Sequence, residues 1–377
     1  MTLLQTENSG ECKGVIAAGG TAGHRVPALA LAEALSDKGA AVSFIGTGRG
    51  LEKELVPQSG YELDMADLRG LERKLSLRVF PFLWSLVKGS IDCLGILRRR
   101  RPDVVVGGGG YVSWAPVFTA WLTRRPTLIV ELDSHMGLAN RVLVPFVKRV
   151  CTSFAIPGRE GGKYLYAGRP FGRKLLTATA DMGRKVFGLK QDMPVVLVTG
   201  GSLGALSINV ACVEAFGGGP LSFQLIHVSG RRDYEMMEKR LQKEDTDSEN
   251  YHLLDYTGDL PLATAAASLV VGRSGASILE LAALGKPALL VPYPYATGDH
   301  QRKNAEWMAG AGAAEVLADD EVSGETLKAR VNNLISNTDR LADMAQASAR
   351  LGKLGAAERI AAEIFDLAGR SESNAHR

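Results

Sequence analysis

The stretch VIAAGGTAGHRVPALALA, residues 15–32, joins a short apolar run to a longer amphipathic run through a glycine-rich turn. The first run is typical of a buried strand, and the spacing of the second is typical of a helix. A turn from strand to helix presents unpaired backbone N–H groups and the positive end of the helix dipole. The stretch therefore predicts an α/β fold with a turn suited to an anion, and a tight bend without a ligand is the alternative.

The same alternation continues along the chain in two series. Continuously apolar strands that alternate with helices predict a parallel sheet covered on both faces. The expected strands are residues 14–18, 41–47, 103–110, 127–132 and 149–154, and then 194–201, 223–230, 251–258, 268–275 and 288–294. The restart predicts two doubly wound domains with a ligand cleft between them.

Composition limits the class of protein. The 377 residues are 46% apolar and 23% charged, with a net charge of +3, which predicts a folded chain and does not indicate nucleic-acid binding by itself. The four cysteines form no CxxC pair, which favours a reducing compartment, the cytosol by default. The N-terminus lacks a signal-peptide pattern and no run reaches about 18 apolar residues, so any membrane contact is expected to be peripheral.

One apolar stretch, residues 77–87, precedes the basic cluster Arg98 to Arg101. A buried helix and an aromatic patch that rests on anionic lipid beside basic anchors are both open at this point.

Two further glycine-rich turns strengthen the first. GGSLG, residues 200–204, has the same placement at the start of the second series, and Ser202 offers a hydroxyl to an anion. GGGGYVS, residues 107–113, leaves backbone open to close approach by a ligand, with a structural crossing as the alternative. A nicotinamide dinucleotide is disfavoured, because residues 19–23 lack the G-x-G-x-x-G spacing and the second strand ends in IGTG, without an acidic residue.

Polar residues follow two strands of the second series. In GRSGASILE, residues 272–280, Glu280 either complements the helix dipole or accepts hydrogen bonds from ribose hydroxyls. DHQRKNA, residues 299–305, suits sugar hydroxyls, with a plain polar loop as the alternative. His227 and His252 lie within apolar strands and are expected to be hydrogen-bonded core residues.

Two other features contain residue types that can take part in chemistry. His24 opens the first helix and is a candidate general base, although a structural hydrogen bond would also suit it. Asp245 and Asp247 resemble a metal-binding pair, but they lie in the polar stretch KEDTDSEN and are expected to be solvated. We expect no metal site.

Seven blocks in order from residue 19 to 305 resemble the MurG family of UDP-N-acetylglucosamine transferases, which act on lipid-linked N-acetylmuramoyl-pentapeptide in peptidoglycan synthesis. The blocks are GGTAGHRVPALALAEAL, FIGTGRGLEKELVP, VVVGGGGYVSWAP, ELDSHMGLANR, GGSLGALSIN, RSGASILELAALGKPALLVPYP and DHQRKNA. The resemblance implies a GT-B fold of two Rossmann-like domains. The acceptor-binding domain would be residues 1–166, with a helix at about 352–370 packed back onto it, and the UDP-sugar domain residues 167–351.

The resemblance also implies the site and the reaction. His24 would be the base for an inverting attack of the muramoyl 4-hydroxyl on the anomeric carbon of UDP-N-acetylglucosamine. The implied donor-binding residues are Thr21, Ala22, Gly23, Arg173, Ser202, Thr257, Ala276, Ser277, Glu280 and Gln301, and the implied acceptor-binding residues are Gly20, Tyr111, Asp133 and Asn140. Ser202 would meet the diphosphate, Glu280 the ribose and Gln301 the N-acetylglucosamine. No cofactor or metal is implied.

The chain departs from the family pattern at four places. Glu131-Leu132-Asp133 replaces Glu-Gln-Asn, and the turn before Glu280 is one residue shorter. Arg169 and Arg173 compete for one phosphate-facing role, and Arg302 follows Gln301 where the family often has a second glutamine. The implied partners are UDP-N-acetylglucosamine, undecaprenyl-linked muramoyl-pentapeptide, the anionic cytoplasmic face of the plasma membrane and other cell-wall enzymes, with roles in cell shape and division. A UDP-N-acetylglucosamine 2-epimerase and a non-catalytic UDP-sugar-binding subunit remain as alternatives.

Overall fold

The computed structural model describes residues 11–19, 22–48, 52–68, 79–134, 136–159, 161–201 and 204–370, without the side chains of residues 22–25, 79–86 and 297. The chain divides into unit 1, Met1–Gly172 with Leu354–Arg377, and unit 2, Arg173–Lys353. The sequence predicted the domain boundary after residue 166, whereas the first segment of unit 1 continues to Gly172. Ala167 belongs to the core of unit 1, and its carbonyl accepts two hydrogen bonds from Arg359, which holds this segment in unit 1.

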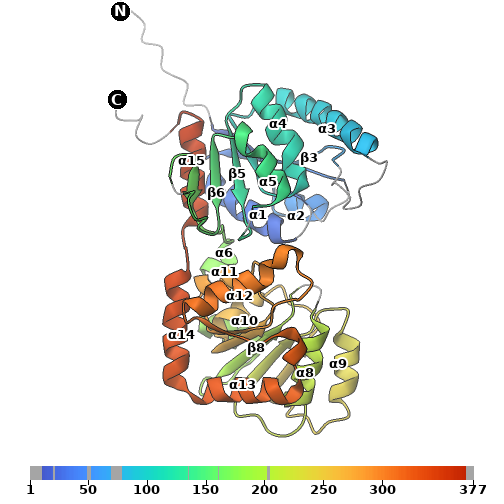
Figure 1. Ribbon diagram of the computed structural model, residues 1–377, viewed down its shortest axis with the longest axis vertical. Coiled ribbons are helices and arrows are strands. Elements are labelled where there is room, and N and C mark those ends of the chain that lie inside the picture. Colours follow the sequence, from blue (N-terminus) through green and yellow to red (C-terminus); the bar gives the residue numbers. More distant parts are fainter. Residues whose placement is uncertain are drawn as a thin grey trace, which may run out of the picture. The chain divides into compact units, whose positions relative to one another are not determined.

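Unit 1 contains a parallel sheet of seven described strands (Figure 1). Their order is β3-β2-β1-β4-β5-β6-β7, so the chain changes direction across the sheet between β1 and β4. The strands are β1 (Lys13–Ala17), β2 (Ala41–Gly46), β3 (Glu62–Met65), β4 (Val104–Gly107), β5 (Thr127–Glu131), β6 (Arg149–Thr152) and β7 (Tyr164–Tyr166).

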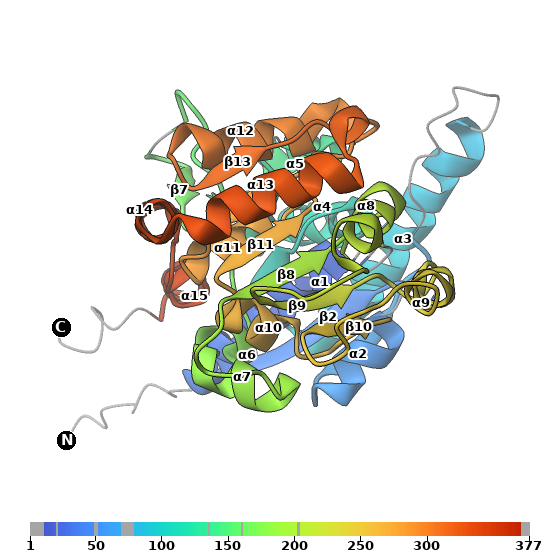
Figure 2. The ribbon, with the colours of Figure 1, turned by 90° about the horizontal axis from the view of Figure 1, so that it is seen from below.

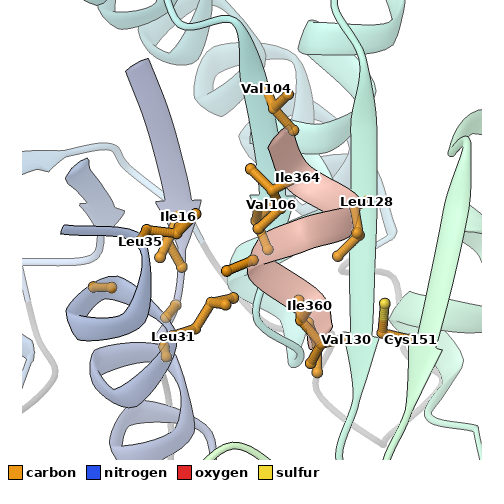
Figure 3. Close-up of a cluster of buried hydrophobic side chains, with 14 of the residues drawn as sticks. Ile16, Leu31, Leu35, Val104, Val106, Leu128, Val130, Cys151, Ile360 and Ile364 are labelled. Atoms are coloured by element: carbon orange, nitrogen blue, oxygen red, sulfur yellow. The ribbon is translucent and has the colours of Figure 1, made fainter. Parts of the chain in front are cut away.

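Helices cover both faces of this sheet because alternate strand residues are apolar on each side. The helices are α1 (Ala22–Asp37), α2 (Glu52–Gln58), α3 (Val79–Arg100), α4 (Trp114–Leu122), α5 (Leu138–Leu143) and α15 (Ala356–Leu367), with 3-10 turns η1 (Tyr111–Ser113) and η2 (Val144–Phe146). One core contains residues of α1 and α15, and the other contains residues of α3 and α4. Figure 3 shows Ile360 and Ile364 of α15 among Val106 and Leu128 of the central strands.

Unit 2 contains a second parallel sheet, in the order β10-β9-β8-β11-β12-β13. The same change of direction occurs here between β8 and β11. The strands are β8 (Val195–Thr199), β9 (Gln224–Val228), β10 (Tyr251–Leu254), β11 (Leu269–Gly272), β12 (Ala288–Leu290) and β13 (Ala314–Val316). Both units therefore have the predicted doubly wound α/β architecture.

The helices of unit 2 also lie on both faces of its sheet (Figure 2). Residues of α8 and α13 form one core with β8 and β11, and α7 packs against α10 on the other face. The helices are α6 (Arg173–Leu176), α7 (Ala180–Phe187), α8 (Leu206–Phe216), α9 (Tyr234–Leu241), α10 (Leu260–Ala266), α11 (Ile278–Ala283), α12 (His300–Gly310), α13 (Gly324–Ser336) and α14 (Thr338–Leu351), with η3 (Thr297–Asp299) and η4 (Asp319–Glu321).

Helix α3 carries the predicted apolar stretch and the basic cluster in different parts of its length. Val87 and Arg98 are separated by about 16 Å of helix at 1.5 Å per residue, so the apolar stretch and the arginines lie at different ends. Asp64 accepts hydrogen bonds from Arg99 at 2.5 Å and Arg100 at 2.6 Å. Both arginines line a cavity beside the amino ends of β1 and β2, the sheet edge opposite the glycine-rich turns. In the described ranges, no helix has the length and apolarity that a membrane span requires.

Candidate active site

The glycine-rich turns singled out in the sequence follow strands at the switch point of each sheet. In unit 1 the turns come after β1 and β4, which are neighbours, and in unit 2 they come after β8 and β11, also neighbours. In open parallel sheets, ligands bind beyond the carboxyl ends of the strands at the point where the strand order reverses. The topology therefore places both pairs of turns where a ligand is expected.

The two turns of unit 1 contact each other directly. The backbone N–H of Gly108 donates to the carbonyl of Ala17 at 2.8 Å, and the hydroxyl of Ser113 donates to the same carbonyl at 3.3 Å and to that of Gly109 at 2.9 Å. Gly110, with a φ of 72°, lies close to Gly19, because a Cβ there would come 3.5 Å from the Gly19 carbonyl oxygen. Tyr111 follows at once and is 39% exposed, which leaves its ring available to a ligand of this site.

Several predicted site residues have no described side chain. Gly20, Thr21 and Ser202 lie outside the described residues. Ala22 and Gly23 open α1, and His24 lies in its first turn, but only the backbone of these positions is described. Their binding and catalytic roles remain predictions, and the structure contributes the placement of His24 in the first helical turn after β1.

Glu52 is a residue of this site that the sequence did not reveal. Its side chain is fully buried, and Oε1 accepts hydrogen bonds from the backbone N–H of Thr47 at 3.2 Å and from its hydroxyl at 2.7 Å. A Cβ at Gly19 would lie 2.9 Å from Oε1, so this carboxylate abuts the turn after β1. Acidic residues in a first helical turn are common at the surface, and nothing in the sequence pattern separates Glu52 from those.

Glu131 and Asn140 shape the loop after β5. Glu131 accepts hydrogen bonds from the backbone N–H groups of Asp133 and Gly137, both at 3.0 Å, and from Nδ2 of Asn140 at 2.9 Å. Burial raises the pKa of Glu131, and these three donors oppose the rise. Asn140 is only 3% exposed. Asn140 therefore supports the loop after β5 from the inside, whereas Asp133 is a half-buried residue of the loop itself.

The turns after β11 and β12 form one hydrogen-bonded scaffold in unit 2. The hydroxyl of Ser274 donates to the carbonyl of Gln301 at 2.7 Å, and Nδ2 of Asn304 donates to the carbonyl of Ser274 at 2.9 Å. Oε1 of Gln301 accepts from the backbone N–H of Tyr293 at 2.9 Å, which orients the side-chain amide. These contacts hold Ser274, in the turn that leads to Ala276, against the start of α12, where Gln301 lies.

Arg273 connects the turn after β11 to the end of β12, to α8 and to η4. Its guanidinium donates to the carbonyls of Val291 and Pro292 and to the hydroxyl of Ser207, and it pairs with Asp319 at 2.6 Å. Helix α11 then begins at Ile278, directly after Ser277, and places Glu280 in its first turn. Ser277 is exposed and Ala276 and Glu280 are half-buried.

Thr257 and Arg173 lie in a second part of unit 2. The hydroxyl of Thr257 accepts from the backbone N–H of Asp259 at 3.0 Å at the start of α10. Lys174, next to Arg173 on α6, donates to the carbonyl of Gly258 and pairs with Asp259, both at 2.7 Å. Arg173 is exposed and belongs to unit 2, whereas Arg169 is 4% exposed and belongs to unit 1. Of the two arginines, Arg173 is the one that shares a unit with the predicted nucleotide site.

The structure also describes the surroundings of His227, His252 and Asp247. Both ring nitrogens of His227 have hydrogen-bond partners, as predicted, whereas the buried Nε2 of His252 has none within the described residues. Asp247 accepts hydrogen bonds from the backbone of Leu221 and the side chain of Asn250, so it organises its own loop. In the part of the chain that is described, no cluster of three or more His, Cys, Asp or Glu residues suits a metal ion.

Two family models match the chain: the glycosyltransferase family 28 N-terminal domain over residues 15–152 and the glycosyltransferase family 28 C-terminal domain over residues 195–360. Curated relatives named as UDP-N-acetylglucosamine--N-acetylmuramyl-(pentapeptide) pyrophosphoryl-undecaprenol N-acetylglucosamine transferase are similar along most of their length. The Halothermothrix orenii relative is 38% identical over 351 residues, which cover 90% of this chain and 94% of the relative. The Levilactobacillus brevis relative is 37% identical, with coverage of 92% and 96%.

Solved structures agree with this comparison. The crystal structure of Acinetobacter baumannii MurG superposes with a TM-score of 0.76 at 25% identity and covers 94% of this chain and 99% of that one. A putative UDP-N-acetylglucosamine 2-epimerase from Listeria monocytogenes gives a TM-score of 0.66 at 14% identity, covers 96% and 98% of the two chains, and shows likeness of fold alone. Matches to both halves of the chain, at this identity and coverage, show that the protein belongs to glycosyltransferase family 28 and, within it, to the MurG family.

Proposed function

We propose that the protein transfers N-acetylglucosamine from UDP-N-acetylglucosamine to the 4-hydroxyl of lipid-linked N-acetylmuramoyl-pentapeptide, with inversion at the anomeric carbon. The observation that carries the proposal is the similarity to relatives named for this transfer, which extends over 90% or more of the chain. The four switch-point turns, after β1, β4, β8 and β11, lie within the matched regions, so the resemblance includes the positions where the chemistry is expected.

The proposed reaction is a single displacement. The oxygen of the acceptor 4-hydroxyl forms a bond to the anomeric carbon while the bond from that carbon to the UDP oxygen breaks, and UDP leaves with the electron pair. The hydroxyl proton passes to a base, for which we propose His24 at the start of α1. A base in this role contributes about 10²- to 10⁴-fold to the rate. Gly20, Tyr111 and Asp133 would contact the acceptor, with Asn140 in support.

The donor would bind at unit 2. We propose that Glu280 accepts hydrogen bonds from the ribose and that Gln301, whose Oε1 is taken by the backbone of Tyr293, presents its Nε2 to the N-acetylglucosamine. Arg173, Ser202 and the backbone N–H groups of the turn after β8 would neutralise the diphosphate as its charge grows. Thr21, Ala22 and Gly23 complete the proposed donor set, together with Thr257, Ala276 and Ser277. We expect this reaction to need no metal or cofactor.

The acceptor carries a lipid, so we propose a peripheral contact with the cytoplasmic face of the membrane. Trp114, Phe118 and Trp121 of α4 form an aromatic cluster with Phe146 of η2, with ring centroids 4.8 to 5.6 Å apart. Trp121 is 43% exposed, Leu122 next to it in sequence is 57% exposed, and Leu138 at the start of α5 is 64% exposed. Exposed aromatic and aliphatic side chains on neighbouring helices favour an interfacial membrane contact. Contacts with other cell-wall enzymes, and roles in cell shape and division, would follow from this location.

A 2-epimerase is the rival that the fold allows. It needs only UDP-N-acetylglucosamine, whereas a transferase needs the lipid-linked acceptor as well. We therefore expect the protein incubated with UDP-N-acetylglucosamine alone to leave the sugar unchanged by proton NMR. Accumulation of the 2-epimer in the absence of acceptor would contradict the proposed function.

A further inference from the structure

The turn after β8 packs against the end of β9. Gly204 closes this turn with a φ of 76°, and a Cβ added there would lie 2.4 Å from the carbonyl oxygen of Ser229 and 3.0 Å from Oδ2 of Asp233. Contacts this short admit only glycine. The position of the turn therefore depends on how firmly Ser229 and Asp233 are held.

Asn209, in the first turn of α8, holds both groups. Its Nδ2 donates to the carbonyl of Ser229 at 2.8 Å and to Oδ2 of Asp233 at 3.0 Å. The side chain is fully buried, and the backbone N–H of the same residue donates to the carbonyl of Ala205 at 2.9 Å. A single residue thus connects the end of the turn, the start of α8 and the end of β9.

His227 determines which way the amide of Asn209 points. Nε2 of His227 lies 3.1 Å from Oδ1 of Asn209. Because Nδ2 of Asn209 serves two acceptors, Oδ1 must itself be the acceptor on the other side, and Nε2 of His227 must carry the proton. Nδ1 is then unprotonated and accepts from the hydroxyl of Tyr251 at 2.8 Å.

The network continues to Cys212 and is sealed from solvent. The sulfur of Cys212 lies 3.5 Å from the hydroxyl oxygen of Tyr251, and because that hydroxyl donates its own hydrogen to Nδ1 of His227, its oxygen accepts from the Cys212 thiol. Burial lowers the pKa of His227 to about 3 and raises the pKa of the Cys212 thiol to about 12. The ring is therefore neutral at physiological pH, and the hydrogen bonds run in one direction from Cys212 to Asp233.

We propose that His227 and Asn209 are positioning residues for donor binding: the tautomer of His227 fixes the Asn209 amide, which holds Gly204 and the turn that receives the donor diphosphate. This inference rests on the proposed function, which puts the diphosphate at that turn. Neither side chain touches the donor, because both are fully buried. Their loss should weaken donor binding and leave acceptor binding and the proton transfer unaffected.

Steady-state kinetics of three variants test the proposal. His227→Phe removes both ring nitrogens, and we expect the KM for UDP-N-acetylglucosamine to rise about tenfold while kcat and the acceptor KM stay within about twofold. Tyr251→Phe removes one oxygen and leaves the ring free to change tautomer, and we expect a rise of about threefold. His252→Phe is the matched control on the neighbouring strand. Its side chain points to the opposite face of the sheet from that of Tyr251, so the donor KM should not change.

An unchanged donor KM in both network variants, or an equal rise in the control, overturns the proposal. If His227→Phe does not fold, Tyr251→Phe decides, and ¹⁵N spectra of the wild-type imidazole add a second test. We expect a protonated Nε2 and an unprotonated Nδ1, and the opposite tautomer contradicts the inference. If the wild-type protein transfers no sugar, the proposed function fails instead, and the affinity of the same variants for UDP, measured by calorimetry, still tests the positioning.

Discussion

Glu52 brings three segments of unit 1 together in one buried side chain. Its carboxylate accepts hydrogen bonds from the N–H and the hydroxyl of Thr47 and lies against Gly19 in the turn after β1, and its Cγ lies close to where a Cβ at Gly46 would be. A buried carboxylate with partners on one oxygen is costly to remove, because its donors lose their acceptor and a cavity remains.

Replacement of Glu52 should therefore destabilise unit 1. We expect Glu52→Ala to lower the free energy of unfolding by about 2 to 4 kcal/mol, from the lost hydrogen bonds and the cavity together. Urea denaturation measures the change. Glu54→Ala, at an exposed position of the same helix, is the control and should stay within about 0.5 kcal/mol of wild type. Equal stability of the two variants would refute this account of Glu52.

His24 and Glu280 should separate chemistry from donor binding. We expect His24→Ala to lower kcat by about 10²- to 10⁴-fold with nearly unchanged affinity for UDP, because the base acts only on the acceptor hydroxyl.

Glu280→Ala should weaken UDP affinity by about tenfold through lost ribose hydrogen bonds. Stopped assays and calorimetry with UDP measure the two effects. Full turnover in His24→Ala would remove this residue as the base.

At the residue scale, the sequence predicted the site residues that belong to a recognisable motif. It did not predict residues whose importance comes only from their contacts in the folded chain. Glu280 and Gln301 lie at the expected turns because the motif and the topology coincide. The contact of Glu52 with the turn at Gly19 and the pairing of His227 with Asn209 were not predicted, because each joins residues that are well separated in sequence. Asn140 was expected to face the acceptor. In the structure it is buried and donates a hydrogen bond to Glu131, and this contact depends on how the loop after β5 folds.

At the scale of elements, Lys286 caps α10. Its ammonium group donates to the carbonyls of Ala265 and Ala267 at 2.6 and 3.1 Å, the end of the helix where a positive charge is favourable. Burial, with a smaller contribution from Arg184, lowers the pKa of Lys286 to about 8 from 10.5. Between these values the unfolded chain keeps the proton and the folded chain releases it, so the free energy of unfolding rises with pH in that window.

The pH dependence of Lys286→Met tests this assignment. We expect the wild type to gain stability relative to Lys286→Met as the pH rises from 8 to 10.5, and the difference to be constant below pH 8. Denaturant titrations at several pH values measure it. Lys328→Met, at an exposed position of α13, should show no such trend. Parallel curves for wild type and Lys286→Met would contradict the shifted pKa.

The aromatic cluster on α4 should govern membrane contact. We expect Trp121→Ser to reduce binding to anionic phospholipid vesicles at least about fivefold, because a half-exposed indole contributes to interfacial binding through its apolar area. Val186→Ser removes an apolar side chain of comparable exposure from α7 in unit 2 and should bind as wild type does. Vesicle flotation measures both, and equal loss in the two variants would count against this surface.

Central elements were easier to predict than edge elements. The central strands β1, β4, β8 and β11 are continuously apolar because both faces are covered, and the sequence placed them within a few residues. The strands β3, β7 and β13 were missed. Each is three or four residues long and carries polar or half-exposed side chains at the edge of its sheet, so the hydrophobic pattern is too weak to reveal it.

At the scale of the whole molecule, two units of the same topology each carry their glycine-rich turns at the switch point. The restart of the strand pattern after residue 194 predicted this duplication. The exact boundary did not follow from the pattern. It depends on Ala167 and Arg359, which tie the segment after β7 to the C-terminal helix of the same unit.

The most direct test of the account is sugar transfer itself. Radiolabelled UDP-N-acetylglucosamine should be converted, in the presence of lipid-linked N-acetylmuramoyl-pentapeptide, into a labelled lipid product with release of one UDP per sugar, and no label should reach the lipid when the acceptor is omitted. A protein that binds UDP yet leaves the lipid-linked acceptor unlabelled would contradict the proposed transfer.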